Sequence, residues 1–398
     1  MTRRRRRTCP RPDAPVALPD DDDILSEILL RLPPQPSSLP RASLVCKRWR
    51  RLITNPQFRR SFRARHRNPP PPPPPPPIGF FNDLVRSSFF SSVLDPPDLI
   101  PAERFSLPLR DDKQWNIFGC RHGRVLLYNR EQKEIVVWDP PTGDYRRVAV
   151  PPEFDNEERT IWNGAVLCAA AADLSHVHGG FCSCPFKVAV AGVTSDNAQV
   201  FACIYSSETG KWSDLVATAV PFVVYSFSHP GTLVGNTLYW MPIGRGDGIV
   251  EFDLDRHSLA VIEWPSNAKV SGNGNSRVVV AEDGGLGLAI LSCYMLQMWE
   301  RKICSEGVEI WVLQKSHKLQ KILGQMSGSV VLLGYANDIH VMLLWINARI
   351  WMLHLDSLQC RKLWETRVIC RNHPYATIYD SGVAMGLQNL LHLHQICS

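Results

Sequence analysis

The 398-residue chain is 44% hydrophobic and 21% charged, which excludes a fully disordered protein and supplies the core of one large domain or two smaller ones. No apolar run approaches the roughly 18–20 residues that cross a bilayer, and no apolar stretch of a secretory signal follows the basic run Arg3–Arg7. We therefore expect a protein that has no membrane span and stays inside the cell.

The charge is unevenly distributed along the chain. Residues 1–68 contain 17 Lys and Arg against 6 Asp and Glu, whereas the remaining residues contain 27 against 32. Such asymmetry indicates different partners for the two parts. The run Arg3–Arg7 has three interpretations: a nuclear-import signal, a nucleic-acid contact or a solvated tail. Because no aromatic residue is interleaved with basic residues before Trp49, the stacking platform of a single-strand binder is absent.

Residues 18–62 carry helical signals. Asp20–Asp23 place negative charge where a capping oxygen and the helix dipole favour it, so a helix should begin there, and Pro33-Pro34 should end it. The apolar residues of this helix follow the spacing of one buried stripe: Ile24, Leu25, Ile28, Leu29 and Leu32.

A second helical pattern follows, with Ser37 and Ser38 as cap candidates and Pro40 in the first turn. Its apolar positions are Leu39, Ala42, Val45, Cys46, Trp49, Leu52 and Ile53. We expect two or three short helices. Because a unit of roughly 45 residues is too small to bury all these groups, some should face a partner or the larger domain.

Nine consecutive prolines, Pro69–Pro77, mark a domain boundary, because proline neither continues a helix nor donates to a strand ladder. As polyproline II at about 3.1 Å per residue, the run would form a spacer of roughly 28 Å. The alternative is a low-complexity repeat without a spacing role.

After the prolines the apolar period becomes two, which predicts an all-β region. Strand–turn–strand units recur at residues 135–148, 200–215 and 249–262, with weaker copies at 308–323 and 349–364. The expected turn centres are Gly143, Gly210, His257, Ser316 and Leu358, about 54 residues apart on average, which is the size of a propeller blade.

Partner strands are expected to precede several units, at residues 123–128, 235–241, 284–291 and 340–345. Four-stranded sheets at this period predict a β-propeller of five or six blades, with an irregular pair of β-sandwiches as the alternative. Five tryptophans should lie mostly in blade cores: Trp138, Trp212, Trp240, Trp299 and Trp351. The predicted fold class is α+β multidomain, with a small helical head before an all-β, propeller-like domain.

The head resembles the F-box motif. The resemblance rests on Leu18-Pro19-Asp20, on Leu32-Pro33 after the first helix and on the run Val45-Cys46-Lys47-Arg48-Trp49. Together with Phe80-Phe81 and the segments 119–127 and 137–140, it is similar to plant (grass-type) F-box proteins with a C-terminal F-box-associated β domain. On this resemblance the chain divides into a disordered basic tail (1–17), F-box helices (18–62), a Pro-rich linker (63–78) and a β-propeller-like substrate-binding domain (79–398).

The resemblance implies that the head docks on a Skp-type adaptor of a cullin-RING ubiquitin ligase and that the β domain binds an unknown protein substrate. The docking surface would come from eleven residues: Leu18, Pro19, Leu25, Ile28, Leu29, Leu32, Pro33, Leu39, Ala42, Val45 and Trp49. The alternative is that all of these residues pack inside the chain.

No catalytic motif competes with this interpretation. The chain lacks Gly-x-Ser-x-Gly, His-Glu-x-x-His and a Walker loop, and Gly244–Gly248 is expected to be a hairpin loop. The twelve cysteines lack the spacing of a disulfide scaffold, so reduced thiols are expected. The residues with some metal-ligand character lack standard zinc spacing: His176, His178, Cys182, Cys184, His392 and His394. We predict no metal, cofactor or catalytic residue.

The sequence thus predicts the substrate-recognition subunit of an SCF-type ubiquitin ligase, located in the nucleus, the cytoplasm or both, without membrane or nucleic-acid partners. The alternative is a non-catalytic nuclear or RNA-associated binding protein that uses its basic N-terminus. A propeller enzyme is a third class, which no motif favours.

Overall fold

The computed structural model describes residues 21–32, 38–43, 45–55, 57–58, 61–62, 65, 79–84, 87–94, 105–106, 114–140, 143–154, 158–169, 185–221, 223–227, 229–245, 248–265, 268, 275–324, 328–337, 340–366, 369 and 371–375. The predicted basic tail, the proline run and the six His and Cys residues considered as metal ligands lie outside these ranges. Within the described residues, no helix reaches the length and apolarity that crossing a bilayer requires.

Three short helices form the head, as predicted: α1 (Asp22–Leu30), α2 (Ser38–Ser43) and α3 (Lys47–Thr54). The Asp21 side chain caps α1 by accepting a hydrogen bond from the Asp23 backbone N–H at 2.8 Å. The second helical pattern divides into two helices, because Cys46 has extended backbone angles and forms the N-cap of α3.

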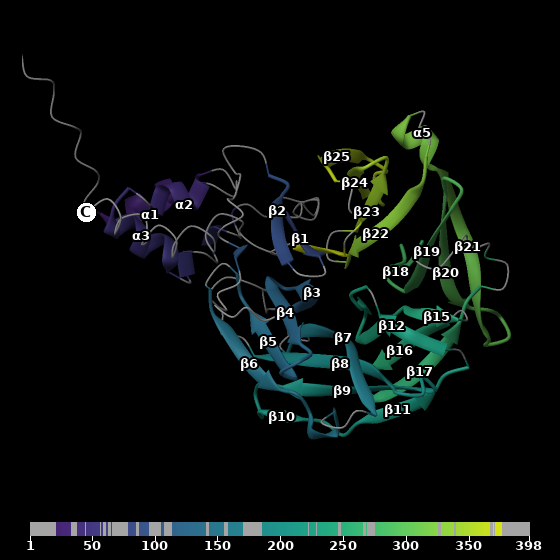
Figure 1. Cartoon of the computed structure of the whole chain (residues 1–398). Coiled ribbons are helices and arrows are strands. Elements are labelled where there is room, and N and C mark those ends of the chain that lie inside the picture. Colours follow the sequence, from purple (N-terminus) through teal and green to yellow (C-terminus); the bar gives the residue numbers. More distant parts are fainter. Residues whose placement is uncertain are drawn as a thin grey trace, which may run out of the picture.

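The β region consists of sheets arranged as blades around a common centre (Figure 1). The first blade contains β3 (Asn116–Arg121), β4 (Arg124–Asn129), β5 (Glu134–Trp138) and β6 (Tyr145–Ala149), and a 3₁₀ turn, η2 (Pro152–Phe154), follows it. The second contains β7 (Arg159–Cys168), β8 (Phe186–Thr194), β9 (Gln199–Ser206), β10 (Lys211–Trp212) and β11 (Val216–Ala219). The third contains β13 (Thr232–Val234), β14 (Thr237–Trp240), β16 (Gly248–Asp253) and β17 (Ser258–Glu263).

Two further four-stranded blades follow. The fourth contains β18 (Ser276–Val280), β19 (Leu286–Ser292), β20 (Met295–Ile303) and β21 (Glu309–Lys318), and the short helix α5 (Leu319–Leu323) follows it. The fifth contains β22 (Val330–Ala336), β23 (Val341–Ile346), β24 (Arg349–His354) and β25 (Cys360–Glu365). A separate pair joins β12 (Val223–Phe227) to β15 (Pro242–Arg245).

The sixth blade closes the ring with strands from both ends of the β region. In this closing sheet, β1 (Gly79–Leu84) pairs with β2 (Ser87–Ser92) on one side and with β26 (Arg371–Tyr375) on the other. Phe81 therefore lies opposite Phe90 and His373. The six blades confirm the predicted propeller.

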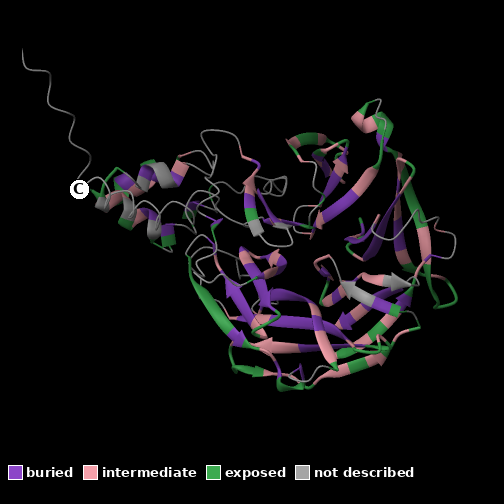
Figure 2. Cartoon of the chain, viewed as in Figure 1, coloured by how far each residue is buried: buried purple, intermediate pink, exposed green. Residues whose placement is uncertain are grey.

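Six apolar clusters join neighbouring blades all the way round the ring. Each cluster contains buried residues from two adjacent sheets, for example Tyr128 with Val188, Ala191 with Leu238, Ile249 with Leu288, Leu296 with Leu344, Leu343 with Phe80, and Tyr375 with Val125. Figure 2 shows burial in the middle strands of the blades and exposure on outer strands such as β6 and β21. Each blade thus completes its core only against its neighbours.

Most predicted turns and strands agree with the structure. Gly143, Gly210, His257 and Leu358 have positive φ angles at the turns between outer strands. Of the five tryptophans named above, Trp138, Trp240 and Trp299 are buried in blade cores, whereas Trp212 and Trp351 are half-buried against theirs.

Two local predictions are wrong. Residues 308–323 contain no turn at Ser316, because Ser316 pairs with Gln297 inside the β20–β21 ladder, and the hairpin instead turns at Gly307, whose φ is +77°. The expected hairpin loop at Gly244–Gly248 is also wrong, because Gly244 lies in β15 and Gly248 begins β16, and these strands belong to different sheets. In both cases the pairing partner lies outside the local pattern.

Candidate functional site

The helical head has an apolar core of its own. Seven buried side chains form it, and all come from the head: Leu25, Leu29, Leu39, Ala42, Ile53, Phe58 and Phe62. No described residue of the propeller belongs to this cluster. The head is therefore stabilised by its own packing, while Ile24, Ile28 and Val45 remain exposed on its surface.

The eleven predicted docking residues fall into distinct positions. Leu25, Leu29, Leu39 and Ala42 are buried in the head core, and Leu32 and Trp49 pack partly buried against it. Ile28 and Val45 are exposed, at 46% and 54%. Leu18, Pro19 and Pro33 lie outside the described residues. The structure thus divides the described members of the predicted set into core residues and surface residues. Contact between any of these residues and an adaptor stays a prediction.

An apolar ridge lies on the surface of α1. Ile24 is 52% exposed and stands one turn before Ile28, so the two side chains share a face of the helix. We call this pair the α1 ridge. Ile24 was not among the predicted docking residues, although it belongs to the same apolar stripe. Since Leu25 and Leu29 occupy the inward edge of that stripe, Ile24 and Ile28 occupy its outward edge.

Ion pairs hold α1 against the rest of the head. The Asp22 carboxylate accepts hydrogen bonds from Arg48 at 2.6 Å and Arg51 at 3.1 Å, and Glu27 accepts one from Arg65 at 2.7 Å. The bond from Arg48 lowers the pKa of Asp22, and the bond from Arg65 lowers the pKa of Glu27. Because these pairs are exposed, each contributes modestly, but together they fix the orientation of α1.

These lowered pKa values predict an acid-sensitive head. A carboxylate whose pKa is depressed in the folded state stabilises that state above its ordinary pKa, and this contribution is lost as the pH falls through the lowered value. Hydrogen-exchange protection of the α1 amides should therefore hold from neutral pH to about pH 5 and decline below about pH 4.

A double variant, Asp22→Asn with Glu27→Gln, is the control for this acid response. It should show weaker α1 protection at neutral pH and a smaller decline in acid, measured by mass spectrometry on the full chain. An equally steep decline in the double variant would assign the acid response to other groups.

Metal-ligand clusters and reactive thiols are the other kinds of site that we considered in the part of the chain that the structure describes. These residues contain no group of three or more His, Cys, Asp or Glu that could hold a metal ion. The seven described cysteines form no disulfide. Burial raises the pKa of Cys360 to about 11 and also raises that of Cys203, so neither thiol is poised as a nucleophile.

Comparison with known proteins identifies both parts of the chain. A family described as "F-box domain" matches residues 17–61, and one described as "F-box protein AT5G49610-like, beta-propeller" matches residues 116–380. The F-box/kelch-repeat protein At3g17530 of Arabidopsis thaliana is 26% identical over 301 residues, which are 74% of this chain and 70% of that protein. The F-box protein At5g03970 of the same plant is 23% identical over 259 residues, 62% of this chain and 57% of that protein.

Solved structures also resemble the chain. A chain of the nidogen/laminin complex matches with a TM-score of 0.40 at 9% identity, covering 74% of this chain and 96% of that one. The WD40 domain of SCAP from fission yeast matches with a TM-score of 0.37 at 13% identity, covering 68% and 56%.

Proposed function

Because the chain belongs to the family of F-box proteins with an AT5G49610-like β-propeller, we propose that it is the substrate-recognition subunit of an SCF-type cullin-RING ubiquitin ligase. The head would dock on a Skp-type adaptor, and the propeller would bind a protein substrate. The curated relatives come from Arabidopsis, and membership of a grass-type group stays a prediction.

The α1 ridge is the observation that carries this proposal. A self-contained head that keeps two isoleucines about half exposed on one helix face presents an apolar surface for another protein. Covering such side chains contributes up to roughly 1.5–3 kcal/mol each. The surrounding ion pairs hold α1 in place, so little ordering of the helix would be needed on binding.

In this role the protein performs no bond chemistry itself. By holding the substrate near the ubiquitin-loaded enzyme, it raises the effective concentration of the substrate lysine and makes the transfer effectively intramolecular. The propeller supplies a rigid ring for this purpose, because its six interblade clusters fix each blade against the next.

Deleting residues 17–61 tests the proposal. The full chain should co-elute with a Skp-type adaptor and a cullin in size-exclusion chromatography, and the deletion should lose both while the propeller stays folded. Deleting Arg3–Arg7 is the matched control and should leave co-elution intact. Persistent co-elution without residues 17–61 would contradict the proposed docking.

We also propose that the protein acts in the nucleus, the cytoplasm or both. A nuclear-import signal is one of the three interpretations of the basic run Arg3–Arg7, and the run is also the feature behind the RNA-associated alternative. If deleting this run abolished a salt-sensitive RNA interaction on which the protein's function depended, the alternative would replace the ligase role.

A further inference from the structure

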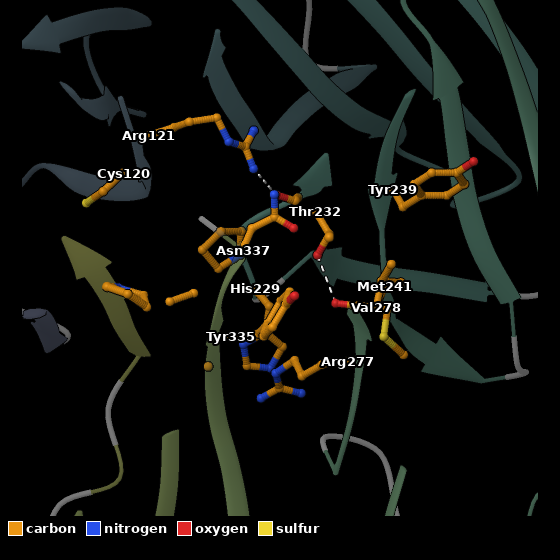
Figure 3. Close-up of a pocket in the computed structure, with 15 residues that line it drawn as sticks. Cys120, Arg121, His229, Thr232, Tyr239, Met241, Arg277, Val278, Tyr335 and Asn337 are labelled. Carbon is orange, nitrogen blue, oxygen red and sulfur yellow. Dashed lines mark hydrogen bonds between the residues drawn. The ribbon is translucent and has the colours of Figure 1, made fainter. Parts of the chain in front are cut away.

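A cavity that opens to solvent and has an internal volume of about 50 Å³ lies at the centre of the propeller (Figure 3). Its lining comes from innermost strands or adjoining segments of five blades, including β3, β13, β18, β22 and β26. The second blade supports the lining from behind, since the Asn163 side chain on β7 donates a hydrogen bond to the His229 carbonyl at 2.8 Å. The cavity therefore exists only in the closed ring.

Among the described residues that line the cavity, the permanently charged side chains are both arginines. Arg121 on β3 and Arg277 on β18 contribute to the lining, and their exposed fractions are only 8% and 4%. No aspartate or glutamate is among the lining residues that the structure describes. Burial lowers the pKa of Arg277 to about 9, which leaves its guanidinium protonated at neutral pH. Two cations are thus held where charge is costly to bury.

Backbone carbonyls hold both guanidinium groups in place. Arg121 donates to the Gly231 carbonyl at 3.0 Å, and Arg277 donates to the carbonyls of Ser276 and Leu332. The bonds to Gly231 and Leu332 connect inner segments of different blades, so they also have a structural role. Carbonyl oxygens are neutral dipoles, and they orient the guanidinium groups without adding a negative charge to the cavity.

The pKa values of two histidines near the arginines are lowered, first by burial and then by nearby positive charge. Burial lowers the pKa of His229 well below its ordinary value, and the charges of Arg277, Arg371 and His373 lower it further. Burial and Arg371 lower the pKa of His373 to about 3. His373 is 2% exposed, and within the described structure neither of its ring nitrogens has a hydrogen-bond partner. Of these groups, Arg121, Arg277 and His229 belong to the cavity lining, and they come from three different blades.

We propose that the central cavity of the propeller binds a phosphoryl group, with Arg121 and Arg277 as its charge partners. A phosphate ester carries a charge of roughly −1.5 to −2 at pH 7, which matches two guanidinium groups better than a single carboxylate does. Guanidinium groups also bind phosphate oxygens through paired hydrogen bonds. Figure 3 shows Arg121 and Arg277 on opposite sides of His229 and Asn337 in that view, and both arginines belong to the lining of the cavity.

Apolar residues in the same lining would contact the body that carries the phosphoryl group. Met241, Pro230 and Val278 belong to the lining, so the site suits an organic phosphate rather than the bare ion alone. The carrier is either a phosphorylated side chain of a protein or a phosphorylated small molecule. The site is independent of adaptor docking, and loss of either activity would leave the other intact.

Calorimetric titration of the full chain tests the site, first with inorganic phosphate and then with N-acetyl-phosphoserine amide and ribose 5-phosphate. Inorganic phosphate should bind, and the ester that binds more tightly identifies the class of carrier. N-acetyl-serine amide should not bind. Absence of binding by all three phosphates would overturn the proposal.

Met241 allows a matched pair of variants. Met241→Glu places a carboxylate in the cavity and should weaken phosphate binding at least tenfold. Met241→Gln introduces a side chain of the same shape as glutamate but without its charge, and it should change the phosphate affinity less than threefold. Equal phosphate affinity in the two variants would mean that phosphate binds outside this cavity and would overturn the proposal. A further measurement needs no variant: phosphate should raise the melting temperature of the wild-type chain above that in chloride of equal ionic strength, and no rise would contradict the site.

Discussion

Replacing both Ile24 and Ile28 with aspartate should weaken binding of a Skp-type adaptor at least 100-fold. Both side chains are about half exposed on one face of α1, so binding would bury their remaining accessible apolar surface. In the variant, binding would instead bury two charged carboxylates. A loss of about 2.8 kcal/mol corresponds to this factor of 100. Calorimetry with purified adaptor measures the change, and circular dichroism checks that the head remains helical.

The matched control places the same two substitutions on another exposed apolar surface. Ile303→Asp with Ile310→Asp alters residues that are 71% and 43% exposed at the β20–β21 hairpin, and it should leave adaptor affinity unchanged. Aspartate at Leu25 or Leu29 would not be informative, because both are fully buried and the head would unfold. Full affinity in the Ile24 and Ile28 variant would exclude the α1 ridge as the docking surface.

Tyr375→Ala should destabilise the propeller by roughly 3–5 kcal/mol, the range for removing a large buried ring. Tyr375 is fully buried in the closing sheet, where its ring packs edge-on against Phe81 and Phe90, and its hydroxyl donates to the Gly123 carbonyl at 3.0 Å. The substitution would leave a cavity between β26 and the first blade. The midpoint of urea unfolding, followed by tryptophan fluorescence, measures the loss.

Tyr375→Phe separates the hydroxyl from the ring. This variant keeps the packing and loses one hydrogen bond, so it should cost only about 1 kcal/mol, with a further penalty from the Gly123 carbonyl if water cannot reach it. If Tyr375→Ala were no less stable than Tyr375→Phe, the closing sheet would contribute little to the stability of the ring.

Local patterns were sufficient for most individual elements of this fold. The aspartate cap and the turn residues are short-range signals, and the structure confirms the helix after Asp21 and the turns at Gly143, Gly210, His257 and Leu358. The number of blades required more, because β1 and β26 are distant in sequence and only their pairing forms the sixth blade. The turn predicted at Ser316 failed for a related reason, since β20 keeps its partner paired beyond that residue.

The candidate site was predicted only in part. Spacing identified the apolar stripe of α1, but a stripe as wide as Ile24 to Leu29 spans both the inward and the outward side of a helix, and only packing separates them. Arg121 and Arg277 appear in the sequence as ordinary strand residues. Their convergence depends on which strand is innermost in each blade, and residue spacing does not specify this.

Closure of the ring by strands from opposite ends of the β region has a consequence during protein synthesis. The buried contact between Asn82 and Asn372 joins residues 290 positions apart. At 5–20 residues per second, the ribosome needs roughly 15–60 s to deliver β26 after β1 has emerged. During that interval β1, which carries Phe80 and Phe81, lacks its partner strand β26. Nascent chains of this protein should therefore depend on a chaperone that shields the first hairpin until translation ends.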